Sequence, residues 1–145
     1  MKFPFRMRWS ISGSASLERY VANPSELRRS FEIVTLDARY AEVVCEVDLL
    51  PLNPRPYEPV MVQFLVGHPT AARITVHGDG DTHLVRVPGF AGVEDEVRIV
   101  RGSGTAPAEP GTLMVPAGSV FELVEAICAH NEPPGPVELV EQDMD

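Results

Sequence analysis

The segment from Gly111 to Val140 reads GTLMVPAGSVFELVEAICAHNEPPGPVELV and decides the fold of this chain. Residues 111–116 predict a strand, and residues 117–130 predict an amphipathic helix. A proline-rich turn at 133–136 then leads into a short final strand. The apolar stripe of the helix has the i, i+3, i+4, i+7, i+8 spacing of a core-facing surface, and it consists of Val120, Leu123, Val124, Ile127 and Cys128.

Both predicted helices begin at residues that favour a helix start. Asn23 can cap an earlier helix, and Pro24 suits its first turn because the missing N–H would have no partner there. The apolar stripe of that helix contains Leu27, Phe31 and Val34. At the C-terminal helix, Ser119 and Glu122 have the spacing of a capping box.

Strands dominate the rest of the chain. Apolar and polar residues alternate from Phe5 to Ile11, which predicts a half-buried strand. Residues 77–81 predict a tight turn, while the proline-dense stretch 51–59 and the Gly- and Pro-rich stretch 102–111 predict loops. Further strands are predicted over 40–50, 60–66, 72–77, 82–87 and 96–101.

These elements predict a single α+β domain over residues 1–145. Strands that follow one another through short turns favour antiparallel pairing. We therefore expect a mainly antiparallel sheet of about six to seven strands, with two helices packed on one face. The chain has 145 residues, of which 44% are hydrophobic and 23% charged, as in ordinary globular domains.

The N-terminal residues and the cysteines point to the cytoplasm. The first nine residues, MKFPFRMRW, contain neither an uninterrupted apolar stretch nor a small-residue cleavage site, so no signal peptide is predicted. No apolar run approaches the ~20 residues that span a bilayer, and we expect no membrane association. Cys45 and Cys128 lie in apolar patterns, and we expect two buried thiols rather than a disulfide.

The charge of the chain indicates what kind of partner it binds. The formal net charge is −9, from 21 acidic and 12 basic residues. Phosphate backbones repel such a protein, so we expect no nucleic-acid binding. A basic protein would be attracted to it instead.

The densest polar cluster is formed by His77, Asp79, Asp81 and His83. Imidazoles and carboxylates can ligate a divalent metal, but this spacing matches no known metal motif. Asp and Gly are also the residues that tight turns prefer, so we interpret the cluster as a hairpin turn, with no metal and no cofactor. The chain also lacks a Gly-x-Ser-x-Gly elbow and a phosphate-binding glycine loop, so we expect no enzyme activity.

Several short motifs carry a resemblance to a known family. They are the opening strand Met7–Ile11, the helix start Pro24–Leu27, the strand end Phe64–Gly67, the lead-in Val115–Pro116, the helix pair Glu125–Ala126 and the turn Pro136–Val137. Their order resembles a family of bacterial immunity proteins from polymorphic toxin systems. The family usually has a tryptophan two residues after the Pro-Val pair, where this chain has Leu139.

The resemblance implies a small cytoplasmic α+β protein that neutralises a toxin encoded beside it. Many toxins of such systems act on nucleic acids, so the implied partner is a basic cognate toxin whose active site or substrate groove is occluded. The expected partner-binding residues are Arg55, Tyr57, Asp79, Asp81, Glu94, Asp95, Glu96, Glu138 and Glu141.

Two alternative functions remain open on the sequence. A secretion chaperone or adaptor is also small, acidic and α+β, and it would bind an unfolded segment of one effector. A small-ligand or metal-binding domain would use the cluster between His77 and His83.

Overall fold

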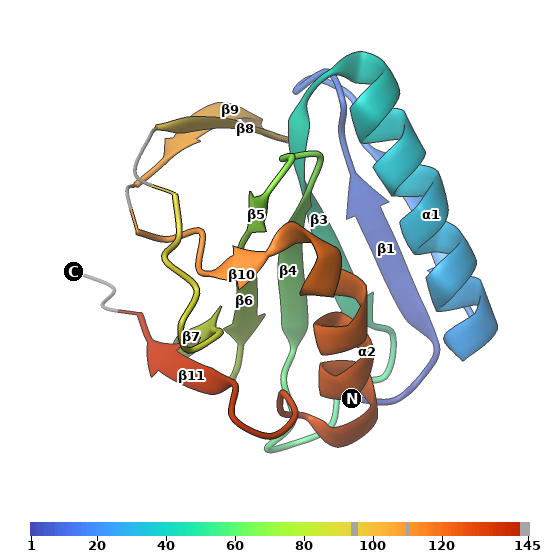
Figure 1. The fold of residues 1–145 in the computed structure, drawn as a ribbon. Helices are drawn as coiled ribbons and strands as arrows, with labels where there is room; N and C mark the ends of the chain where they lie inside the picture. The colour runs from blue at the N-terminus through green and yellow to red at the C-terminus, as the bar shows by residue number, and fades with distance from the viewer. Residues whose placement is uncertain (94–95, 110, 143–145) are drawn as a thin grey trace.

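A large, mostly antiparallel sheet with two α-helices on one face forms the protein (Figure 1). The computed structural model describes residues 1–93, 96–109 and 111–142. The helices are α1 (Pro24–Ala41) and α2 (Val120–His130), and a 3-10 turn, η1 (Ala117–Ser119), precedes α2. The strands are β1 (Phe5–Trp9), β2 (Leu17–Val21), β3 (Val44–Pro51), β4 (Met61–Val66), β5 (Ala71–Ala72), β6 (Ile74–His77), β7 (Thr82–Arg86), β8 (Val97–Arg101), β9 (Gly104–Ala108), β10 (Val115–Pro116) and β11 (Glu138–Glu141).

The main path of the sheet has the order β11-β7-β6-β4-β3-β1-β2. The hairpin of β8 and β9 joins it through a short parallel pairing of β8 with β3, which brings the sheet to nine strands. Strands β10 and β5 form a separate two-stranded sheet. The predicted α+β class is confirmed, and the main path contains the seven strands at the upper end of the predicted number.

Helix α1 begins where the sequence predicts and ends later than predicted. The side chain of Asn23 accepts a hydrogen bond from the Glu26 N–H at 2.9 Å, and Pro24 occupies the first turn. The prediction of a strand from residue 40 is wrong, because the helix continues to Ala41 and β3 starts at Val44. The buried face of α1 extends through Ala38, and Glu42 ends the helix in the left-handed conformation at φ 56°.

A close backbone approach explains why a glycine follows β4. Gly67 has φ +108°, and a Cβ there would lie 2.1 Å from the Val43 carbonyl oxygen. Only glycine adopts this conformation without strain and leaves room for that oxygen. The end of β4 is thereby held against the turn that joins α1 to β3.

Four further departures from the sequence-based predictions concern β9, β2, β10 and the start of α2. The stretch 102–111 contains β9, which within the described residues is an edge strand paired with β8 alone, and edge pairing tolerates Pro107. Strand β2 was not predicted from the sequence, yet it pairs along all of β1. Only Val115–Pro116 of the predicted strand 111–116 is paired, and Ser119 makes no side-chain capping bond to α2.

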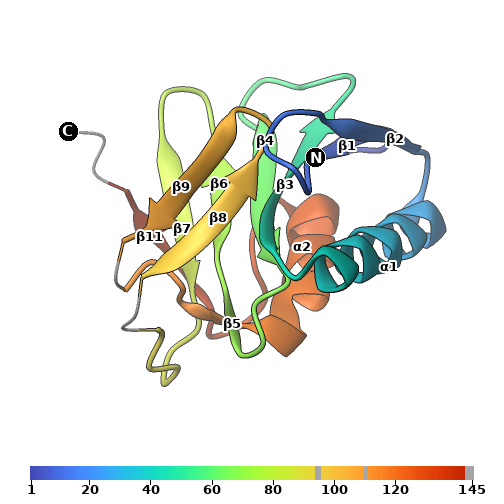
Figure 2. The same cartoon turned by 90° about the horizontal axis from the view of Figure 1, so that it is seen from above.

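The two faces of the sheet carry two cores of different size. The larger core lies between the sheet and both helices, and it includes the alternating residues Phe5, Met7 and Trp9 of β1. Figure 2 shows both helices on that side and the β8–β9 hairpin over the opposite side. The hairpin covers a smaller core of Leu65, Ala71, Val97, Ile99, Ala108 and Leu113. In the described part of the chain, neither helix has the length and apolar character needed to cross a bilayer.

Candidate functional site

Three segments that are distant in sequence meet around one hollow, which we call the Tyr57 hollow. It has a volume of about 600 Å³, and the residues that line it include Tyr57, Glu58, Asp79, Asp81, His83 and Leu139. They come from the proline-rich loop before β4, from the turn between β6 and β7 together with the start of β7, and from β11. Sheet pairing brings them together, because β6, β7 and β11 are consecutive strands of the sheet. The Val60 N–H donates to the His77 carbonyl at 2.8 Å and fixes the loop to β6.

Tyr57 is the most exposed aromatic residue at this hollow. Its side chain is fully exposed, and its backbone has φ 68°, in the left-handed region. The Glu58 N–H donates to the Arg55 carbonyl at 3.3 Å, which closes a turn around it. A non-glycine residue in this conformation costs of order 1–3 kcal/mol and occurs often at binding sites. The turn therefore presents the ring to solvent.

The acidic side chains of the β6–β7 turn lie along the same hollow. Asp79 and Asp81 are exposed, and the Gly78 N–H donates to the Asp81 carbonyl at 3.0 Å to close the turn. The Asp81 carboxylate lies 3.9 Å from Nδ1 of His83. Glu141 is the Cα partner of His83 in the pairing of β11 with β7. The hollow thus combines an exposed aromatic ring with a surplus of carboxylates.

The other predicted partner-binding residues lie apart from this hollow. Arg55 is exposed in the proline-rich loop but does not line it. Glu138 alternates with Leu139 along β11, so it faces the other side, where Arg86 Nε donates to it at 3.0 Å. Glu96 lines a separate depression beside the β8–β9 hairpin. Glu94 and Asp95 lie outside the described residues.

The candidate metal ligands do not converge. His77 is paired with Thr82 in the sheet and His83 with Val76, so the two imidazoles point to opposite faces. Nε2 of His77 lies 2.5 Å from Oε1 of Gln63, while His83 lies beside Asp81. Within residues 1–93, 96–109 and 111–142, no group of three or more His, Cys, Asp or Glu side chains is placed to hold a metal ion.

A charged network on the sheet face opposite the helices was missed by the sequence analysis. Glu46 and Asp48 alternate with buried residues of β3, so both carboxylates point to this face. Between them, the amide nitrogen of Gln63 donates to Asp48 at 2.8 Å and to Glu46 at 3.3 Å. The alternation along β3 was the available signal, but only the pairing with β4 shows that Gln63 joins the two carboxylates.

Three arginines complete this network, from β1, from β8 and from the single residue between β5 and β6. Arg8 of β1 lies 3.1 Å from Asp48, whereas Arg73 and Arg101 lie 3.0 Å and 3.5 Å from Glu46. The Glu46 side chain is 11% exposed, so its charge depends on these partners rather than on water.

His77 makes the stability of this network depend on pH. Burial lowers the pKa of His77 below 6.5, and the nearby carboxylates of Glu46 and Asp48 oppose this effect. The unfolded chain therefore binds a proton more readily than the folded protein. The free energy of unfolding should be at its full value above pH 6.5 and should fall as the pH drops through the folded pKa. In His77→Gln, urea titrations from pH 7 to pH 5.5 should give a flatter dependence; an unchanged slope would contradict this assignment.

Both cysteine thiols have low reactivity at neutral pH. Cys45 and Cys128 are free and buried. Burial raises the pKa of each thiol to about 12. At Cys45 the carboxylates of Asp37 and Glu46 add to this effect, whereas at Cys128 the N-terminal ammonium opposes it and Glu125 adds to it. Since the thiolate is the reactive form, neither cysteine suits nucleophilic catalysis at neutral pH.

No protein-family model matches the chain, and no curated protein matches it.

Proposed function

We propose that this protein is an immunity protein that binds a cognate bacterial toxin, one that acts on nucleic acid, at the Tyr57 hollow. The observation that carries the proposal is the meeting of Tyr57 with Asp79 and Asp81 at one hollow. Tyrosine is enriched among the residues that dominate binding energy at protein interfaces. A carboxylate-rich rim around it complements a basic partner.

The proposed mechanism is occlusion of the toxin. A toxin that acts on nucleic acid needs a basic surface to hold phosphates. The carboxylates of Asp79 and Asp81 would occupy that surface, while the Tyr57 ring would fill a pocket at its centre. Net charge of −9 would also speed the encounter at low salt. Binding alone would block the toxin, so this mechanism requires no chemical reaction by the protein.

The first experiment is co-expression with the product of the neighbouring gene, scored by growth and by co-purification. Restored growth together with a 1:1 complex is the expected result. A separate binding assay distinguishes a secretion chaperone, which would bind only an unfolded segment. In this assay the toxin domain is purified in its folded form and then mixed with the protein. If growth is not restored and no complex forms, the proposal is wrong.

Replacing Tyr57 by alanine should weaken toxin binding by at least about tenfold, because it removes the proposed aromatic anchor. The matched control is Tyr40→Ala on α1, since Tyr40 is 93% exposed and lies outside the Tyr57 hollow. Calorimetry or biolayer interferometry gives both dissociation constants. Equal affinities for the two variants would show that Tyr57 is not an anchor.

Charge-reversal variants of the same protein test the acidic rim. Asp79→Lys should lower the association rate and reduce its salt dependence. Glu18→Lys changes the net charge equally, but Glu18 lies on edge strand β2, at the other end of the sheet order. A similar loss in both variants would indicate general electrostatic attraction rather than binding at this rim.

A further inference from the structure

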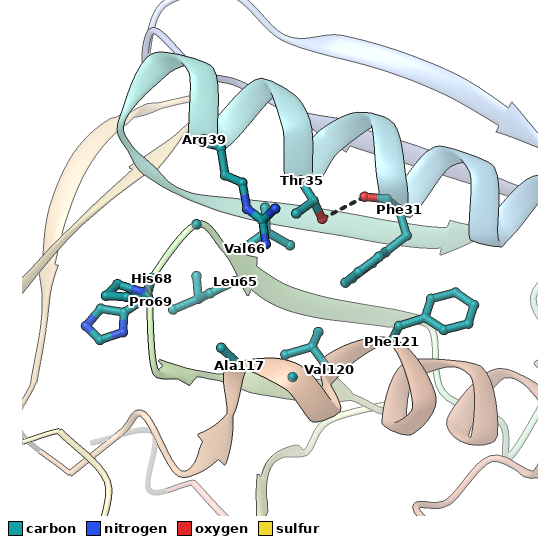
Figure 3. Close-up of a pocket in the computed structure, with 12 residues that line it drawn as sticks. Phe31, Thr35, Arg39, Leu65, Val66, His68, Pro69, Ala117, Val120 and Phe121 are labelled. Carbon is teal, nitrogen blue, oxygen red and sulfur yellow. Dashed lines mark hydrogen bonds between the residues drawn. The ribbon is translucent and has the colours of Figure 1, made fainter.

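A second hollow lies between the two helices at the end of β4, whereas the Tyr57 hollow lies beside the loop that precedes β4. It has a volume of about 560 Å³ and is bounded by α1, by η1 with the start of α2, and by the end of β4. Figure 3 shows the ring of Phe31 and the side chain of Arg39 extending from α1 toward it, with Val120 and Phe121 on the α2 side. Phe31 and Phe121 lie with their ring centroids 5.2 Å apart, so the interior is largely apolar. We call it the interhelical hollow.

The charged groups at the interhelical hollow are cationic. Arg39 lines the hollow. The guanidinium of Arg28 lies 4.4 Å from the centroid of the Phe121 ring, which also lines the hollow. Within the described part of the chain, none of its lining residues is acidic. The protein has a net charge of −9, but an anionic group that enters this hollow would lie next to arginines rather than carboxylates.

An exposed apolar side chain lies next to this surface on α1. Leu36 is 63% exposed and lies three residues before Arg39, so the two side chains are neighbours on the helix. Beyond Arg39, a second open hollow of about 520 Å³ is lined by Val43, Val44 and Val97, and also by one acidic residue, Glu42, and one further arginine, Arg98. Both hollows share Arg39, Gly67 and Pro69. The combined surface is wider than a single small molecule covers, and exposed apolar patches of this kind mark protein interfaces.

We propose that the interhelical hollow binds a segment of a partner protein in which a leucine or an aromatic side chain stands next to an aspartate or glutamate. The apolar side chain would enter between Phe31 and Val120, and the carboxylate would pair with Arg39. An ion pair beside an apolar contact is strengthened because water is partly displaced from it. This surface lies outside the proposed toxin site, and its partner is acidic where the toxin is basic.

Gly118 allows the hollow to be altered without disturbing the fold. It lines the hollow, its φ is not in the left-handed region, and a Cβ added there meets no atom within 4 Å. Gly118→Trp therefore places a large side chain at the edge of the hollow without a backbone clash. Arg39→Glu removes the cation, and Arg29→Glu is its control, with the same charge change at an α1 arginine that does not line the hollow.

The test is selection of random displayed peptides on the wild-type protein, with counter-selection on Gly118→Trp. The enriched peptides should share a leucine or aromatic residue next to Asp or Glu. Their dissociation constants should rise at least about tenfold with Gly118→Trp or Arg39→Glu and stay within about twofold with Arg29→Glu. Melting temperatures of all variants establish that each is folded.

Three results would overturn the inference. They are the absence of peptides that prefer the wild type over Gly118→Trp, enriched peptides without an acidic residue, and equal losses with Arg39→Glu and Arg29→Glu. The selection involves no toxin, so its outcome is separate from that of the co-expression experiment.

Discussion

Phe64→Ala is expected to lower the free energy of unfolding by about 3–5 kcal/mol, the range for truncating a buried phenylalanine. Phe64 is 1% exposed and lies in β4, which packs against both helices. Its ring centroid lies 5.8 Å from that of Phe31. The truncation therefore leaves a cavity at the point where the sheet meets α1. Because small domains have a total stability of about 5–15 kcal/mol, this one change would remove a large part of it.

Urea or guanidinium titration measures this loss, and Tyr40→Ala is the matched control. Tyr40 also loses an aromatic ring, but its side chain is 93% exposed, so its loss should stay near 0.5 kcal/mol or below. A loss of less than about 1 kcal/mol for Phe64→Ala would mean that the interior closes around the missing ring. Such a result would contradict the packing described for the larger core.

Glu46→Ala is expected to cost about 3 kcal/mol, because it leaves charged partners without their counterion. The side chains of Glu46 and Arg73 are only 11% and 15% exposed, so water replaces the lost carboxylate poorly. Gln63 and Arg101 lose a contact in the same step. The expected value lies at the lower end of the range for broken buried ion pairs, since neither group is fully buried.

Glu138→Ala is the control for the charged network. Its partner is Arg86, and both side chains are about half exposed, at 49% and 51%, so this loss should be at most about 1 kcal/mol. A double-mutant cycle of Glu46 with Arg73 then separates their coupling from the other contacts of Glu46. Equal losses in Glu46→Ala and Glu138→Ala would show that burial does not strengthen the network.

Local sequence patterns correctly predicted those helices and strands that are determined by interactions within a single segment of the chain. Asn23 and Pro24 determine the start of α1 through contacts within its first turn. The alternation of Phe5, Met7 and Trp9 predicted β1 for the same reason. Strand β9 was missed, because Gly104 and Pro107 disfavour a strand by themselves and become part of one only by pairing with β8.

The same distinction holds for the candidate surfaces. Tyr57, Asp79 and Asp81 were each predicted as binding residues, since exposed aromatic and acidic residues in turns suggest binding. Their meeting with Leu139 at one hollow depends on the neighbouring positions of β6, β7 and β11, which no local pattern indicates. The interhelical hollow likewise requires α1 and the start of α2 to meet at the end of β4.

The sequence by itself determined the α+β class, the start of α1, the buried face of α2 and the acidic charge of the protein. These depend on composition and on periodicity within single segments. Tertiary structure alone decided the charged network of Glu46 and Asp48, the divergence of His77 from His83, and the two hollows. Each of these depends on long-range strand pairing or helix packing, which brings together side chains that are far apart along the chain.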